Sequence, residues 1–144
     1  MRRLALACVA TVAVADCVLQ RKDLSWFQVG LLDEPAHLAT GILVGGLDPV
    51  FLAGAMLPDA DHLPLVLQDP RPGDPRPGTH SVYLAALAAL VSRRLAAGVL
   101  THFARDLALP PGVPLLGGSR HFRVPYAAYA VLLLASAYSR SRPC

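Results

Sequence analysis

Five histidines lie beside carboxylates or within short polar motifs that interrupt an otherwise apolar chain. The motifs are DEPAH at 33–37, LPDADH at 57–62, GTHS at 78–81, HFARD at 102–106 and SRH at 119–121. Only 10 of the 144 residues are Asp or Glu, so random scattering would rarely place so many beside histidines. Imidazole and carboxylate are the ligands that a borderline hard ion such as Zn²⁺ prefers. The pattern predicts a metal site and favours a hydrolytic one.

Two of these motifs have helical spacing. His102 and Asp106 are four residues apart and therefore share one face of a helix. Such a pair presents two ligands to one ion, or one ligand with its orienting carboxylate; the ordinary alternative is a surface ion pair or a cap. Asp33 and His37 have the same spacing, but Pro35 between them predicts that Asp33 precedes the helix as its N-cap.

The other motifs lie at expected helix ends. Asp59, Asp61 and His62 follow an apolar segment and a proline, where the alternative to a metal site is a solvated, well-capped helix end. Asp61 is the candidate general base or second-shell partner. His80 follows Thr79, a candidate N-cap, and taken alone a histidine there is more often structural.

Composition predicts an all-α, membrane-associated protein. The chain is 54% hydrophobic and 16% charged, against about 25% charged in average soluble proteins, and its apolar residues are mainly Ala, Leu and Val, which suit helices. A Pro/Gly-rich loop at 58–79 and a second loop at 109–125 separate the apolar blocks. These blocks cover residues 4–19, 36–57, 81–109 and 124–138.

Unbroken helices through the two middle blocks would scatter the motifs. His37 and Asp59 are 22 residues apart, as are His80 and His102, and a straight helix would separate each pair by about 33 Å. Turn chemistry at Gly45–Pro49 and the polar Ser92-Arg93-Arg94 break these blocks. We therefore expect a compact bundle of short helical hairpins with the metal motifs gathered at one end. The predicted hairpin helices are 36–45, 50–57, 82–92 and 95–109.

The terminal blocks are the remaining candidates for membrane spans, although both are short. Arg2-Arg3, the apolar stretch and Ala13-Val14-Ala15 also resemble a signal peptide. We favour a retained helix to Leu19, and Asp16 suits neither interpretation. The expected divisions are an N-terminal apolar helix in 1–32, a metal-dependent hydrolase-like domain in 33–125, and an apolar helix with a basic tail in 126–144.

The hairpins would assemble four or five nitrogen and oxygen ligands. They would hold one Zn²⁺, or two if carboxylates bridge, and a bound water of pKa about 7 would supply a hydroxide nucleophile. Further candidate ligands are His121 and Asp33. Arginines near the motifs would receive a substrate phosphate: Arg105, Arg120 and Arg123. The main candidate ligands are His37, Asp59, His62, His80, His102 and Asp106.

Other chemistries have little support. The net charge is +3, but the arginines occur singly or in pairs at segment ends, which suits lipid headgroups better than a continuous nucleic-acid-binding stripe. Cys8, Cys17 and Cys144 form no disulfide framework and no zinc-binding CxxC. The sequence also lacks GxSxG, Walker A, HExxH and GxGxxG motifs.

The ordered motifs resemble the YdjM-like family of membrane-bound metal-dependent hydrolases. The likeness covers about residues 33–125 and includes AMLPDADH at 55–62, RPGTHS at 76–81 and THFARD at 101–106, followed by PGVPLL at 111–116. It implies that seven residues match the family's polar positions: His37, Asp59, Asp61, His62, His80, His102 and Asp106. Their order is also similar, remotely, to that of zinc-dependent phospholipase C enzymes, an all-α fold with a cluster of zinc ions.

The chain departs from the family pattern in three places. Pro75 replaces the first histidine of the HRGxTHS motif, Gly117-Gly118 replaces a Trp-Pro pair, and residues 1–32 precede the usual start. The expected function is a membrane-associated hydrolase, zinc-dependent and acting on a phosphoester or lipid-linked ester. The alternative is a non-catalytic membrane protein with a structural metal or a partner-binding role.

Overall fold

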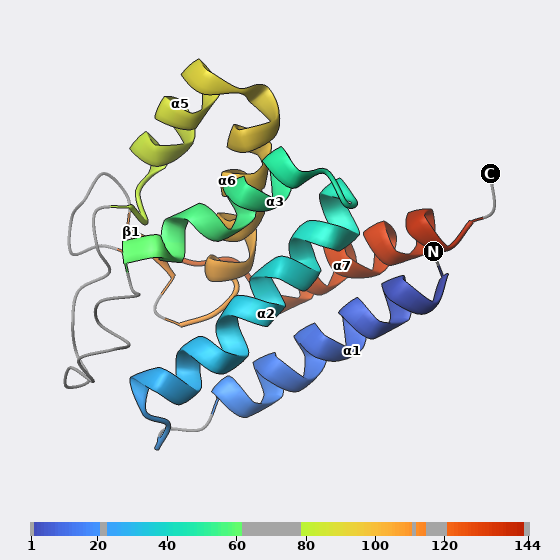
Figure 1. Cartoon of the computed structure of the whole chain (residues 1–144). Helices are drawn as coiled ribbons and strands as arrows, with labels where there is room; N and C mark the ends of the chain where they lie inside the picture. The colour runs from blue at the N-terminus through green and yellow to red at the C-terminus, as the bar shows by residue number, and fades with distance from the viewer. Residues whose placement is uncertain (1, 21–22, 62–78, 111, 115–120, 143–144) are drawn as a thin grey trace.

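The computed structural model describes residues 2–20, 23–61, 79–110, 112–114 and 121–142 (Figure 1). These form an all-α bundle with one short 3₁₀ segment and one antiparallel ribbon in which each strand has two residues. The elements are α1 (Arg2–Leu19), α2 (Trp26–Gly45), α3 (Pro49–Met56), η1 (Leu57–Asp61), α5 (Val82–Val91), α6 (Arg93–Asp106), β1 (Val113–Pro114), β2 (His121–Phe122) and α7 (Tyr126–Ser141).

The bundle has two apolar clusters. In the first, α1 and α7 pack beside α2 (Figure 1), and the buried residues are Ala5, Cys8, Val12, Ala15, Ala36, Ala39, Leu43, Ala108, Tyr129 and Leu133. In the second, α6 packs on α5 and β1 with Ala88, Ala96, Val99, Phe103 and Val113. The polar motifs lie where α2, η1 and α6 approach one another.

α2 begins earlier than the sequence predicted. A capping box starts it, in which the Ser25 side chain accepts from the Gln28 amide and the Gln28 side chain accepts from the Ser25 amide. The helix continues through Pro35, so the expected start at residue 36 was wrong. Asp33 is consequently inside α2, one turn before His37, and is not its N-cap.

Both predicted hairpin breaks are confirmed. α2 ends at Gly45, and Asp48 caps α3 by accepting hydrogen bonds from the amides of Val50 and Phe51. α5 ends at Val91, and the Ser92 hydroxyl accepts from the Arg94 amide to cap α6. Each hairpin therefore reverses the chain where a polar turn replaces the apolar run.

Two glycines allow α3 and α6 to cross at backbone contact. A Cβ added at Gly54 would lie 2.1 Å from the Leu95 carbonyl oxygen, and one added at Gly98 would lie 2.1 Å from the Phe51 carbonyl oxygen. Both separations are far inside van der Waals contact. The close crossing brings the Ala55 carbonyl within reach of His102.

None of the helices in the described ranges combines the length and the apolarity needed to span a bilayer. α1 and α7 correspond to the two terminal blocks proposed as spans, and both pack on α2. α2 also runs without interruption across the predicted division at residues 32 and 33.

The Gly54–Gly98 crossing yields a test. Gly98→Ala should lower the free energy of unfolding by about 1–3 kcal/mol, because the methyl group must displace the α3 backbone, despite the better helix propensity of alanine. Urea unfolding followed by circular dichroism measures this. Leu100→Ala is the control, since Leu100 is 57% exposed on the same helix and should change stability by less than about 0.5 kcal/mol. A Gly98→Ala protein as stable as the parent would contradict the crossing.

Candidate metal centre

Five side chains from four segments meet in the interior. His37 comes from α2, Asp59 from η1 and His80 from the residues before α5, while His102 and Asp106 come from one face of α6. All five are at most 6% exposed. The nearest side-chain atoms are 3.7 Å apart for His37 and Asp59 and 3.4 Å for His80 and His102. The predicted convergence is therefore confirmed.

Four of these residues have five donor–donor separations of 3.1–3.6 Å. His80 Nε2 is 3.1 Å from Asp59 Oδ1 and 3.6 Å from Asp106 Oδ2. His102 Nε2 is 3.6 Å and 3.2 Å from the same two oxygens, and 3.4 Å from His80 Nε2. Ligands about 2.0–2.2 Å from one tetrahedral ion lie about 3.3–3.6 Å apart. The chemistry and the separations of these donors therefore fit a divalent ion.

Local hydrogen bonds orient part of this shell. His102 Nδ1 lies 2.8 Å from the Ala55 carbonyl oxygen and donates to it, which leaves the Nε2 lone pair facing the shell. The Thr79 hydroxyl donates to the Pro58 carbonyl at 2.9 Å and ties the segment before α5 to η1. Thr79 thus joins His80 to Asp59, whereas the predicted N-cap role was wrong because Ser81 occupies that position.

His37 relates differently to the shell. Its Nε2 is 3.5 Å from Asp106 Oδ1 and 3.7 Å from Asp59 Oδ2, the carboxylate oxygens on the side away from His80 and His102. The imidazole also stacks on His102, with ring centroids 3.6 Å apart and planes within 8° of parallel. Within the part of the chain that the structure describes, its buried Nδ1 has no hydrogen-bond partner.

A buried guanidinium lies next to His37. Arg105 is fully buried, and its Nη2 donates to Asp16 Oδ1 at 2.6 Å. Its Nη1 donates to Asp33 and lies 3.1 Å from His37 Nε2. Asp16 also accepts a hydrogen bond from the Tyr126 hydroxyl at 2.8 Å. The cation therefore links α6 to α1 and α2, and through Asp16 to α7.

Electrostatics reinforce this arrangement. Burial alone would raise the pKa of Asp33, but the charges of His37 and Arg105 outweigh it and lower that pKa to about 2. Burial likewise opposes ionisation of Asp106, yet the adjacent imidazoles of His102 and His37 outweigh it and hold its pKa well below the usual range. Both carboxylates are thus anions at neutral pH and available to a cation.

The protonation of His37 depends on its surroundings. Burial and Arg105 disfavour the charged ring, but Asp33 and Asp106 outweigh them and raise the His37 pKa to about 9. A guanidinium only donates hydrogen bonds, so the contact from Arg105 requires a neutral ring with its proton on Nδ1. A divalent ion on Asp106 would oppose the effect of that carboxylate. The raised pKa favours the charged ring while no ion is bound, and the hydrogen bond from Arg105 would favour the neutral ring once one is.

The remaining predicted site residues are distributed as follows. Asp61 ends η1, but its side chain is outside the described residues, as are the side chain of His121 in β2 and all of His62 and Arg120. Arg123 is exposed. The roles of Arg105, Arg120 and Arg123 in phosphate binding stay predictions, although Arg105 already contacts two protein carboxylates.

Sequence reasoning missed Asp16 and Tyr126. A single carboxylate in the apolar α1 was the available signal, because a buried charge requires a partner. Nothing in the local pattern of α1 identified Arg105, which is 89 residues away. The interaction is visible only once α1 and α6 are placed in space.

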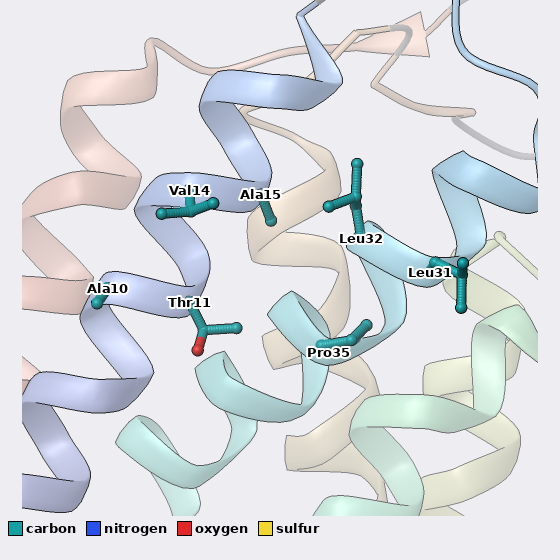
Figure 2. A pocket seen from close by; sticks show the side chains of 7 residues that line it. All are labelled: Ala10, Thr11, Val14, Ala15, Leu31, Leu32 and Pro35. Carbon is teal, nitrogen blue, oxygen red and sulfur yellow. The ribbon is translucent and has the colours of Figure 1, made fainter.

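A separate hollow of about 420 Å³ lies between α1 and α2 (Figure 2). Its lining is apolar apart from Thr11 and contains no member of the histidine–aspartate cluster: Ala10, Thr11, Val14, Ala15, Leu31, Leu32 and Pro35. This hollow offers no ligand for an ion and no group for acid–base chemistry.

No family model, curated protein or solved structure matches this chain. The resemblance to YdjM-like hydrolases therefore stays a prediction.

The ion pair between Asp16 and Arg105 gives a second test. Asp16→Ala should cost about 3 kcal/mol or more of folding stability, because it leaves a buried guanidinium short of one counter-charge. Arg94→Ala provides the control: Arg94 pairs with Asp48 at 3.0 Å, but its side chain is 74% exposed, so at most about 1 kcal/mol is expected. Chemical unfolding of both variants measures the difference. Equal losses would show that the buried pair has no special weight.

Proposed function

We propose that this protein is a divalent-metal-dependent hydrolase, with zinc as its ion and a phosphoester or lipid-linked ester as its substrate. The observation that carries the proposal is the buried meeting of three imidazoles with two carboxylates. Nitrogen and oxygen donors of this kind suit Zn²⁺.

An ion held by these residues would lower the pKa of a bound water to about 7 and polarise the scissile ester. The chain itself contributes fixed ligands, oriented through the Ala55 carbonyl, and an open edge at Asp33. The Asp33 side chain is 25% exposed, whereas Asp59 and Asp106 are 5% and 2% exposed. Asp61, two residues after Asp59, is the proposed general base.

A structural metal site is the second candidate. The observation in its favour is burial, because a closed shell of four protein ligands is typical of structural zinc. Such an ion would contribute folding energy without promoting hydrolysis. Stability and activity measured with and without the ion separate the two roles.

Metal content and activity test the proposal together. Protein purified without chelator should contain near-stoichiometric metal and cleave a chromogenic phosphodiester. Asp59→Ala and His102→Ala should lose both properties because each opens the shell. Asp23→Asn is the control, since this exposed carboxylate lies outside the cluster. Absence of metal, with no binding when zinc is added, would contradict the metal site; metal without hydrolysis would favour the structural role.

Asp61→Asn should separate the base from the ligands. It should retain metal and slow hydrolysis by about 10²–10⁴-fold. Loss of metal as complete as in Asp59→Ala would instead identify Asp61 as a ligand.

We also propose that the protein works at a lipid surface, and that α5 contacts it. This helix is wholly apolar, its only buried residue is Ala88, and Leu90 and Val91 are 84% and 78% exposed. Arg93 and Arg94 follow after Ser92 and are exposed, as suits anionic headgroups.

Binding to anionic lipid vesicles measures this second part. Replacing Leu90 and Val91 together by Asp should weaken sedimentation with vesicles by about 10-fold or more, because insertion of apolar surface drives such binding. Leu31→Asp is the control, because Leu31 is 60% exposed on a different helix, α2. Equal weakening by both changes would exclude α5 as the contact.

A further inference from the structure

The donor atoms of His37, Asp59 and His102 lie close enough to hold one ion, but the orientation of the two imidazole rings argues against it. A metal lies close to the plane of an imidazole that binds it, because the nitrogen lone pair is in that plane. The two rings are 3.6 Å apart and within 8° of parallel, so their planes do not meet near the donors. One ion must therefore belong to one ring, and His102 already shares a shell with His80 through Asp59 and Asp106.

Hydrogen bonding also indicates that His102 is a metal ligand and His37 is not. The ligating imidazole of a metal site normally donates its other N–H to a fixed acceptor. His102 does so to the Ala55 carbonyl, whereas no partner for His37 Nδ1 exists in the described ranges. His37 lacks the support that a ligand usually has.

The position that a second ion would take already has a positive charge beside it. His37 Nε2, Asp33 and the outer oxygens of Asp59 and Asp106 face this position. Arg105 Nη1 lies 3.1 Å from His37 Nε2 and donates to Asp33, while Nη2 is fixed on Asp16 at 2.6 Å. A divalent ion bound there would meet a buried guanidinium with little solvent to screen the repulsion.

We propose that the cluster holds a single divalent ion on His80, His102, Asp59 and Asp106, and that Arg105 supplies the second positive charge beside His37. His37 is then a positioning residue: its Nε2 lies 3.1 Å from Arg105 Nη1 and its ring packs on that of His102. The inference rests on the proposed metal site, and it assigns Arg105 to the neutralisation of Asp16 and Asp33.

Zinc stoichiometry tests the assignment. The protein is first loaded with excess Zn²⁺ and then freed of unbound metal. Elemental analysis and native mass spectrometry should find one zinc ion per chain. His37→Ala should still bind one zinc, with a Kd raised by about 10-fold. The matched variant His80→Ala should lose about 100-fold or more in affinity. Absence of zinc from the parent protein would contradict the metal site itself, whereas two zinc ions in the parent, falling to one in His37→Ala, would overturn only this inference.

A charge-neutral double variant tests Arg105 directly. Asp16→Asn combined with Arg105→Gln removes one charge of each sign, so folding is less at risk than after loss of Arg105 alone. It should open the second position and raise the maximum from one zinc to two per chain. Circular dichroism would first establish that the variant is folded. A folded double variant that still binds one zinc would show that Arg105 does not occupy the role of a second ion.

Discussion

The structure depends on how it accommodates buried negative charge. Four carboxylates meet near the junction of α1, α2, η1 and α6, and one guanidinium, Arg105, lies among them. Taking an unpaired ion out of water costs several kcal/mol. The raised pKa of His37 adds a second positive charge at neutral pH. Under the proposed function, a divalent ion on Asp59 and Asp106 would offset the negative charge that remains.

The rest of the bundle serves that junction. The contact between Gly54 and Gly98 sets α3 against α6 and so fixes the Ala55 carbonyl beside His102. α1 is connected to the site rather than merely appended, because Asp16 holds Arg105 and accepts from Tyr126. The two glycines set α3 against α6, and the ion pair between Asp16 and Arg105 sets α1 against α6. These two contacts position side chains that are far apart in the sequence.

Local chemistry explains what the sequence could predict. The turn before Pro49 and the polar residues around Ser92 mark hairpins, and the hairpins bring the histidines together. The start of α2 was predicted wrongly because Pro35 was taken to mark the helix start. The capping box at Ser25 begins the helix ten residues earlier, and the helix continues through Pro35. The stacked rings of His37 and His102 and the pairing of Asp16 with Arg105 arise from tertiary packing, which spacing along the chain does not specify.

The same charges limit the substrate within the proposed function. Arg105 and one divalent ion would carry three positive charges against four carboxylates, so these groups together keep one net negative charge. Close approach of a phosphate monoester dianion would add two more charges to a poorly screened interior. A phosphodiester brings one, and a carboxylic ester none. A diester or a lipid-linked ester therefore suits this site better than a monoester, and it would approach at Asp33, the edge of the cluster that is partly open to solvent.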